Sequence, residues 1–497
     1  MDQPLTGDRL DLRPLSFVAL VGFAGFVLVV PPPSDDIPVN AVAFWLAWML
    51  CLALLAGRGL WRPSTAYLVL FGLFHGGLLL IAAVRDVDLF ADRDIAWLYH
   101  SRVAEATRLV ILGMTAFALC AELAAGRARR PAATTPSTVA AGPLADPRGS
   151  GIIGLVVEFT GIGIFTASVL GAGGFGLLNG GYRDFLAANE SNELLGYGSL
   201  FIGMGAVIAI NSGGRARVAG WLAFGAHAVV AFQVGGRGEV LFPLLAMLVV
   251  EARRGRPLRP LWTVLGVPFV LVLIALVRTT RLPDGIAAAS TLWSAPLDAV
   301  AEMGCSLRPT AEVLDWHASG EPFRHGITLI AVPVRLVERL GGWHGGTAVL
   351  DDRLFNVEIM DRVGPVGGSP VAEGYHNGGL LGVVLLLGAI GLAVGWLERR
   401  PATLLGHSTV GVLLLPLLVQ IRNSFAPVPA QLAVGVVLLL VVREVAKRPR
   451  DRRPISPAQP GRREDEAQSA TPREAAAPAR PAMARAAVLG AGDRQTS

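Results

Sequence analysis

The feature that most constrains this chain is its series of long apolar runs, which recur from residue 15 to residue 443 with one long interruption at 278–376. Runs such as 15–30, 218–234 and 380–396 are long enough to cross a bilayer, because a membrane helix takes about 20 apolar residues. They lack the alternation of a membrane barrel, and an open sheet would leave unpaired backbone groups in lipid. We therefore expect an all-α polytopic membrane protein.

Composition supports this interpretation. The chain has 497 residues, of which 53% are hydrophobic and 16% charged, whereas a soluble domain carries about a quarter charged residues. The formal net charge of +5 comes from arginines that lie between the apolar runs and form no separate basic domain. These numbers exclude a soluble enzyme and predict no nucleic-acid partner.

We expect about twelve membrane-spanning helices, each needing about 20 residues, and one long outer loop that contains short helices. The predicted spans lie near residues 15–31, 40–57, 64–84, 109–125, 151–170, 196–211, 218–234, 239–251, 261–277, 378–397, 405–421 and 429–443.

Arginines concentrate in alternate short loops between these runs. When the N-terminus is placed inside, most of them fall on the cytoplasmic side, as the positive-inside rule requires. The inside set is Arg9, Arg13, Arg58, Arg62, Arg127, Arg129, Arg130, Arg148, Arg215, Arg217, Arg253, Arg254, Arg256, Arg259, Arg399 and Arg400. The smaller outside set is Arg85, Arg93, Arg102, Arg108, Arg183, Arg237 and Arg422. Both termini are therefore expected to be cytoplasmic.

Changes in composition divide the chain into four predicted parts. They are an N-terminal four-span region (1–130), a cytoplasmic linker rich in Ala, Thr and Pro (131–150), a membrane region expected to be catalytic (151–443) and a disordered cytoplasmic tail (444–497). The third part includes the long outer loop, residues 278–376, and long loops of this kind are usually functional. Within it, 327–340 is too short and too charged to span, and we expect it to lie along the outer membrane surface.

Four arginines at outer helix ends are candidate anion-binding residues. Arg237 lies in a glycine-rich turn between two spans, and its planar fork suits bidentate contact with phosphate. Arg278 and Arg281 stand three apart where a span ends, and Arg422 ends another span on the same side. Together they would form a cationic pocket for a group such as a lipid pyrophosphate. The alternatives are pairing of Arg237 with Glu239, and anchoring of each arginine at lipid headgroups.

A second block, residues 367–379, opens a span from the outer side. Glu373 or His376 could act as a general base toward a sugar hydroxyl, and Tyr375 and Asn377 lie beside them. Without the other motifs, a capped helix start with interfacial Tyr and His would explain the same residues.

Together these motifs resemble the Wzy-type O-antigen or oligosaccharide repeat-unit polymerases, which are GT-C-like polytopic glycosyltransferases. The resemblance rests on residues 235–238, on the exit at Arg278 and Arg281, and on 369–379, and it spans roughly residues 150–445.

The resemblance implies a metal-independent, inverting glycosyl transfer on the outer face of the bacterial cytoplasmic membrane, with no cofactor. A polyprenyl-pyrophosphate-linked oligosaccharide would be the donor, and membrane lipids, a chain-length regulator and a flippase would be partners. By this resemblance, Arg237, Arg278, Arg281 and Arg422 would bind pyrophosphate, Glu373 and His376 would be catalytic, and Tyr375 and Asn377 would bind substrate.

Three alternatives stay open at this stage. An O-antigen-ligase-like transferase would share the architecture but use another acceptor. A transporter or flippase of lipid-linked or anionic solutes should show internal repeats and broken helices near the midplane, whereas the polar residues here gather toward one face. A non-catalytic scaffold would not require the arginines to converge.

Overall fold

A computed structural model describes residues 13–30, 36–57, 59–85, 95–99, 102–126, 147–171, 193–233, 236–259, 266, 269–272, 294–343 and 351–447. The chain divides into two units, Met1–Arg448 and Pro449–Ser497, and the second lies outside the described residues. The described residues are mainly helical and contain no strand, which confirms the all-α prediction for them.

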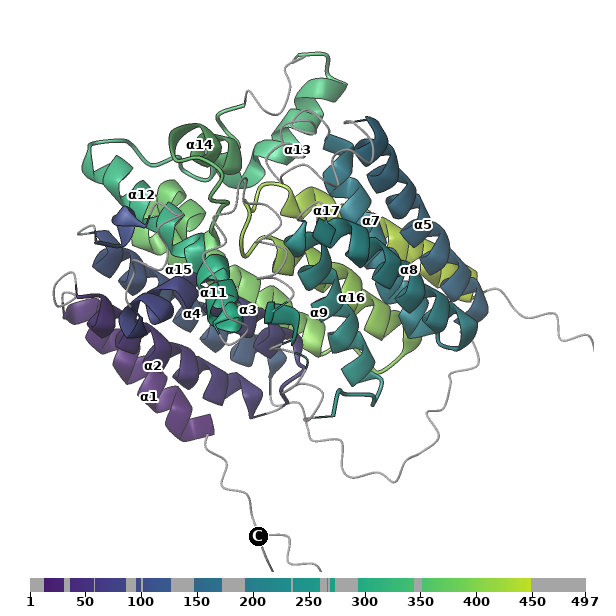
Figure 1. The fold of residues 1–497 in the computed structure, drawn as a ribbon, viewed down its shortest axis with the longest axis horizontal. Helices are drawn as coiled ribbons and strands as arrows, with labels where there is room; N and C mark the ends of the chain where they lie inside the picture. Colours follow the sequence, from purple (N-terminus) through teal and green to yellow (C-terminus); the bar gives the residue numbers. More distant parts are fainter. Residues whose placement is uncertain are drawn as a thin grey trace, which may run out of the picture. The chain divides into compact units, whose positions relative to one another are not determined.

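The helices follow the predicted runs closely (Figure 1). The first half contains α1 (Arg13–Val29), α2 (Ile37–Ala56), α3 (Pro63–Val84), η2 (Ala96–Tyr99), α4 (Arg102–Ala125), α5 (Pro147–Gly171), α7 (Glu193–Ser212), α8 (Gly214–Gln233) and α9 (Arg237–Arg253). The second half contains α11 (Ala295–Met303), η4 (Gly304–Leu307), α12 (Arg308–Ala318), α13 (Ile327–Leu340), α14 (Phe355–Arg362), α15 (Pro370–Glu398), α16 (Leu404–Val419) and α17 (Val428–Ala446). The predicted span 261–277 lies largely outside the described residues.

Seven helices are long and apolar enough to cross a membrane, namely α2, α3, α4, α5, α7, α15 and α17. Helices α1 and α16 are apolar but shorter. The protein is therefore a membrane protein with several spanning helices, while the full set of about twelve spans stays a prediction.

Glycines bring helices from distant parts of the chain into backbone contact. On α15, a Cβ at Gly391 or Gly395 would overlap the carbonyl oxygens of Phe117 and Ala121 on α4. Small residues allow this close approach, which is the usual basis of helix packing in membranes. Helices α4 and α15 run parallel, so the predicted N-terminal region packs directly against the helix that carries Glu373.

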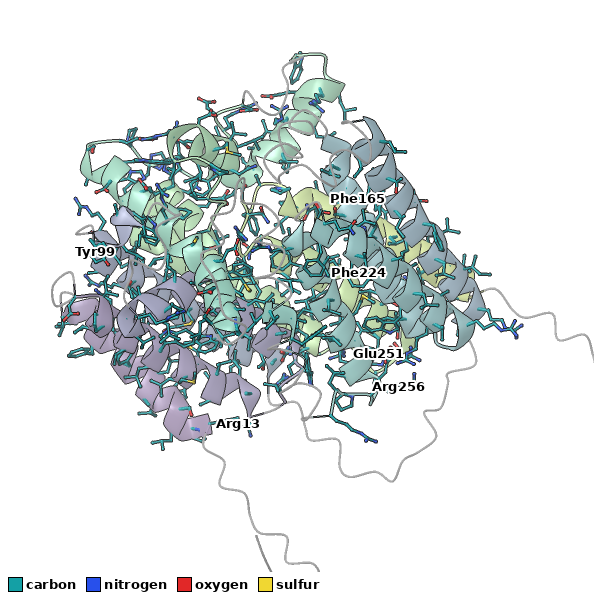
Figure 2. The ribbon with its side chains drawn as sticks, in the orientation of Figure 1. Arg13, Tyr99, Phe165, Phe224, Glu251 and Arg256 are labelled. Atoms are coloured by element: carbon teal, nitrogen blue, oxygen red, sulfur yellow. The ribbon has the colours of Figure 1, made fainter. Side chains whose placement is uncertain are left out.

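A second glycine-lined pair joins α5 and α7, where Gly154 and Gly161 meet the backbone of the partner helix. Helix α8 packs against this pair, and Phe165 and Phe224 both contact the ring of His227 (Figure 2). The core of this part is therefore mostly apolar and aromatic, and it also buries Glu158 and His227.

The described part of the long predicted loop folds into α11, η4, α12, α13 and α14. Helices α12, α13 and α14 lie together at one end of the helical bundle (Figure 1). Gly304 packs on the backbone of Gly77 in α3, which ties the loop to the N-terminal helices. The described residues of this segment therefore contain short helices, while its assignment as one long outer loop stays a prediction.

Helix α13 has one apolar face and one charged face. Ile330, Leu336, Val337 and Leu340 are exposed, whereas Arg335 on the opposite side forms an ion pair with Asp351. This arrangement is typical of a helix that rests at a lipid surface, and its predicted position along the membrane stays a prediction.

Helix α15 is broken by two glycines. Gly378 and Gly379 have non-helical backbone angles, and Gly379 has φ +60°, a conformation that side chains disfavour. The break frees carbonyl groups that a continuous helix would use. Arg324 N donates to His376 O at 2.9 Å and His325 N donates to Asn377 O at 3.0 Å. The segment Pro370–Asn377 therefore forms a short separate helix that is held by the loop before α13.

The break places Gly374 against Gly382, where a Cβ on Gly382 would overlap the carbonyl oxygen of Gly374. We expect Gly382→Ala to destabilise the protein by about 1–3 kcal/mol, because the obstructing atom belongs to the backbone. The matched control is Gly378→Ala, since Gly378 has open space around its Cβ position and an extended φ of −163°. Thermal unfolding of the purified protein in detergent would measure both, and equal midpoints would contradict the packing described here.

Candidate functional site

The short segment Pro370–Asn377 carries four of the predicted site residues. Glu373, His376 and Asn377 are buried, and Tyr375 is half-buried. The segment starts with Ser369, whose Oγ accepts hydrogen bonds from the backbone N–H groups of residues 371 and 372 at 3.2 and 3.4 Å. The predicted capped helix start is therefore present, and it positions the candidate catalytic residues.

A histidine of α3 forms a hydrogen bond with this cap. His75 Nδ1 lies 3.0 Å from Phe71 O, and Nε2 lies 2.9 Å from Ser369 Oγ. A carbonyl oxygen only accepts, so Nδ1 carries the proton and Nε2 accepts from the Ser369 hydroxyl. Helix α3 thus holds the start of α15 in place.

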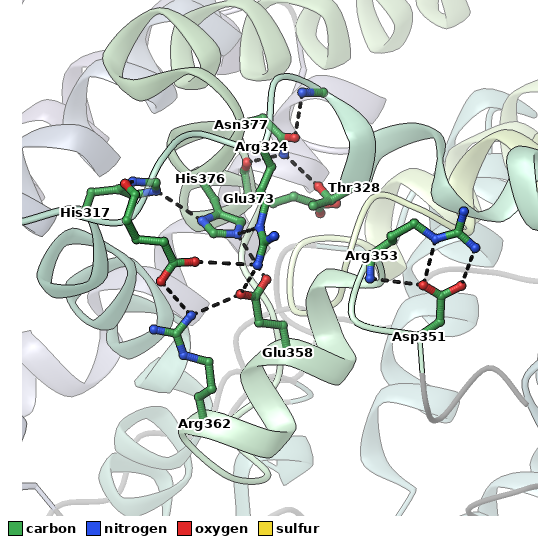
Figure 3. A network of polar contacts seen from close by, with 12 residues as sticks. His317, Arg324, Thr328, Asp351, Arg353, Glu358, Arg362, Glu373, His376 and Asn377 are labelled. Atoms are coloured by element: carbon green, nitrogen blue, oxygen red, sulfur yellow. Dashed lines mark hydrogen bonds and ion pairs between the residues drawn. The ribbon is translucent and has the colours of Figure 1, made fainter. Parts of the chain in front are cut away.

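Glu373 joins three segments of the chain, and Figure 3 shows it beside Thr328 and Asn377. Its Oε1 accepts from Thr328 Oγ1 at 3.0 Å and its Oε2 accepts from Phe425 N at 2.5 Å. Asn377 adds hydrogen bonds from its Nδ2 to Thr328 Oγ1 at 2.6 Å and to Glu373 O at 2.7 Å, and its Oδ1 accepts from Gly326 N at 2.8 Å. The start of α13 and the loop after α16 are therefore both bound to α15 by its polar residues.

Arg422 lies in that loop beside the start of α15. Its carbonyl oxygen accepts from Gly368 N at 2.9 Å, and a Cβ on Gly367 would approach the same oxygen at 2.9 Å. Its guanidinium is 5.8 Å from the ring centroid of Phe74. The side chain is half-buried, and no carboxylate among the described residues forms an ion pair with it. Arg422 is therefore suited to bind an anion.

Arg237 has a different environment, because it is buried and pairs with Glu302 of α11 at 2.5 Å. Phe74 contacts both Phe242 of α9 and Arg422, so the helix of Arg237 and the loop of Arg422 meet the same aromatic ring. Arg278 and Arg281 lie outside the described residues. The convergence of all four arginines therefore stays a prediction.

His376 belongs to a second polar group that the sequence analysis did not identify. Its Nε2 lies 3.0 Å from Glu358 Oε2 and 3.2 Å from Arg324 Nε, and its Nδ1 lies 3.1 Å from His317 Nε2 (Figure 3). The Glu358–Arg362 spacing of four residues on α14 was the one sequence signal for part of this group. His317, on α12, has no neighbouring motif in the sequence.

Two arginines compensate the carboxylates of this group. Arg324 Nη2 lies 2.8 Å from Glu358 Oε1, and Arg362 Nη1 lies 2.8 Å from Glu321 Oε2 and 3.1 Å from Glu358 Oε1. Burial acts to raise the pKa of Glu358, but hydrogen bonds from His376 and Arg324 outweigh burial and lower it to about 2. Glu358 is therefore ionised at neutral pH.

Three ligand-type side chains in this group are close enough to hold a metal ion, namely Glu321, Glu358 and His376, with ligand atoms within 4.8 Å of one another. Both carboxylates are already paired with the guanidiniums of Arg324 and Arg362. A cation would have to displace these arginines, so the donor set fits an ion-paired network better than a metal centre.

A separate ion-paired cluster secures α13. Arg353 contacts Asp351 at 2.8 Å and Glu338 at 2.8 Å, and Arg335 contacts Asp351 at 2.5 Å. The Arg353 hydrogen bonds hold the pKa of Asp351 well below its usual range. This cluster fixes the charged face of α13, while Thr328 in the first turn of the same helix contacts Glu373.

We expect Glu358→Gln to reduce stability by about 3 kcal/mol at neutral pH, because it removes a buried charge from two arginines and a histidine. The folded-state pKa is depressed, so this stabilisation is present above about pH 4.5 and is lost as the pH falls toward 2. The matched control is Glu312→Gln, because Glu312 pairs with Arg308 four residues earlier at 3.2 Å and such partly exposed pairs contribute under about 1 kcal/mol. Denaturation measured at several pH values would test both variants. Equal losses of stability in Glu358→Gln and Glu312→Gln would contradict the network.

The comparison with known families agrees with the motifs. Residues 222–449 match the model of the family described as O-antigen polysaccharide polymerase Wzy. No curated protein and no solved structure matches the chain. The matched residues include Arg237, α12, α13, α14, all of α15 and Arg422, so both polar groups fall within the match. Residues 222–449, a little less than half of the chain, are therefore similar to the O-antigen polysaccharide polymerase Wzy family.

Proposed function

We propose that this protein joins polyprenyl-pyrophosphate-linked oligosaccharide repeat units on the outer face of the bacterial cytoplasmic membrane. The observation that carries the proposal is the placement, inside the family match, of Arg422, which pairs with no carboxylate of the described residues, beside a helix start that bears Glu373 and His376. Both termini would be cytoplasmic, and a flippase and a chain-length regulator would be its partners.

The reaction sets two chemical requirements. An acceptor hydroxyl attacks the anomeric carbon of the donor, so its O–H bond breaks and a glycosidic C–O bond forms. The lipid pyrophosphate leaves with the electron pair of the broken bond. The site must therefore stabilise charge on the pyrophosphate and accept one proton for each linkage.

Arg422 is the best-supported pyrophosphate ligand, because its charge is not compensated by a carboxylate of the described residues. Arg237, Arg278 and Arg281 would add to the same cationic field. Guanidiniums bind phosphate oxygens bidentately, so the leaving group can be stabilised without a metal ion.

Glu373 and His376 are the candidate catalytic residues on the acceptor side, with Asn377 and Tyr375 as substrate-binding neighbours. The half-buried ring of Tyr375 lies 5.9 Å from Phe323, edge to face. An aromatic pair of this kind gives an apolar surface with a polar hydroxyl, which suits the face of a sugar ring. Its position one residue before His376 supports an acceptor site here.

The direct test supplies a polyprenyl-pyrophosphate oligosaccharide to the purified protein in lipid nanodiscs. We expect a ladder of longer lipid-linked glycans, with one free polyprenyl pyrophosphate for each linkage formed. Transfer only to a different acceptor would indicate a ligase instead. Movement of the substrate across a vesicle membrane with no new linkage would indicate a flippase.

We expect Arg422→Ala to lower the rate of polymerisation at least tenfold with little change in the unfolding temperature, because no carboxylate of the described residues loses an ion pair. Arg237→Ala should lower both the polymerisation rate and the unfolding temperature, since it removes the ion pair with Glu302. Asn423→Ala is the matched control, because its exposed side chain bonds only Val419 O among the described residues. Normal polymerisation by Arg422→Ala would remove this residue from the mechanism.

A further inference from the structure

The Nε2 atom of His376 lies between two groups of opposite hydrogen-bonding character. Glu358 Oε2, at 3.0 Å, is a carboxylate oxygen and can only accept a proton. Arg324 Nε, at 3.2 Å, can only donate one. The same ring nitrogen therefore has a partner when it carries a proton and another partner when it does not.

His317, at the other end of this pair of histidines, keeps one proton at Nδ1 whether or not His376 Nε2 is protonated. His317 Nδ1 lies 2.7 Å from Glu321 O, and a carbonyl oxygen only accepts, so this nitrogen is protonated. The remaining two nitrogens, His317 Nε2 and His376 Nδ1, face each other at 3.1 Å. One proton must lie between them, because two lone pairs at this distance would repel.

These contacts define two states that differ by one proton. In the first, His376 carries Nδ1–H toward His317 and both rings are neutral. Its Nε2 lone pair then faces Glu358 Oε2 at 3.0 Å, and the N–H of the Arg324 guanidinium, which donates to the same Nε2, offsets this repulsion. In the second, a proton is added at Nε2 and bonds Glu358, so the pair of rings carries one positive charge. No other proton has to move between the two states.

We propose that His317 and His376 act as one proton-binding unit, in which His317 is a positioning residue that holds His376 ready to take up and release a single proton. The unit connects a buried end to a more exposed end, because His376 is buried whereas His317 is half-buried. Protonated His376 can pass its Nδ1 proton to His317 Nε2 across the 3.1 Å contact.

The charges around the pair explain why it binds one proton and not two. The groups that face it are Glu358 of α14, Glu321 and Arg324 of the loop before α13, and Tyr375 of α15. Arg362 of α14 pairs with both carboxylates. Arg102 and Glu105 of α4 act on Tyr375, and Arg102 also pairs with Asp315 of α12. The Glu358 carboxylate favours the charged state, while the two nearby arginines oppose a second charge. Burial lowers the pKa of the His317 imidazole, and charge on His376 lowers it further.

This inference rests on the proposed polymerase function for its purpose, because that reaction releases one proton for each linkage. The proton-binding unit itself can be tested without substrate. The two ideas can therefore fail separately.

The first experiment is ¹⁵N magic-angle-spinning NMR of histidine-labelled wild-type protein in lipid bilayers. We expect a direct nitrogen–nitrogen coupling between His317 Nε2 and His376 Nδ1, and a single titration step in which both rings respond together. Absence of the coupling, or two independent titration steps, would overturn the proposal.

The second experiment compares His317→Gln with the wild type. Glutamine keeps a hydrogen bond to His376 Nδ1 but cannot share a proton, so a purely structural role would be preserved. We expect the titration of His376 to shift and the pH profile of the polymerisation rate to move with it, with KM little changed.

The matched control is His325→Asn. His325 is an exposed histidine on the same loop with φ 51°, a backbone conformation that asparagine tolerates. It should leave both the titration and the profile unchanged. An unaltered His376 titration in His317→Gln would overturn the proposal. An altered titration in a protein that does not polymerise would overturn the proposed function alone.

Discussion

The arrangement of the site depends on the break in α15 at Gly378 and Gly379. A continuous helix would use the carbonyls of His376 and Asn377 internally, and the loop at 324–326 would lose two backbone acceptors on α15. Because the helix breaks, these carbonyls accept from Arg324 N and His325 N. The same loop brings the Arg324 guanidinium to Glu358 and leads into Thr328, which reaches Glu373. One local departure from helical geometry thus assembles residues from three separate segments.

The N-terminal helices contribute to this assembly although the family match begins at residue 222. Helix α4 packs along the second part of α15 through Gly391 and Gly395, and His75 of α3 bonds the cap of its first part. These contacts consist of close backbone packing and one hydrogen bond, so no sequence motif in the N-terminal helices indicates them. The region before the match is therefore part of the support for the site and not an appended unit.

Much of the fold could be predicted from the sequence, because apolar runs of this length leave few alternatives to membrane helices. The block 367–379 also indicated Glu373 and His376 correctly as neighbours on one helix start, since that relation is local. His317, Glu358 and Arg324 could not be found in this way. They lie 18 to 59 residues from His376, and only the folded loop brings them to its ring. The ion pair between Arg237 and Glu302 was missed for the same reason.

The distribution of carboxylates also separates the arginines by role. Arg324, Arg353 and Arg362 each contact two carboxylates, and Arg237 contacts Glu302. Their charges are compensated within the protein, so they secure the fold of the loop. Arg422 has no such partner among the described residues, and it lies where the backbone of residues 367 and 368 holds its loop against α15. In the proposed function, a pyrophosphate would add its charge there without breaking an ion pair among the described residues. An excess of arginine on one side of a membrane therefore indicates the orientation of the chain in the membrane. An arginine that no carboxylate compensates indicates instead a binding site for an anionic ligand.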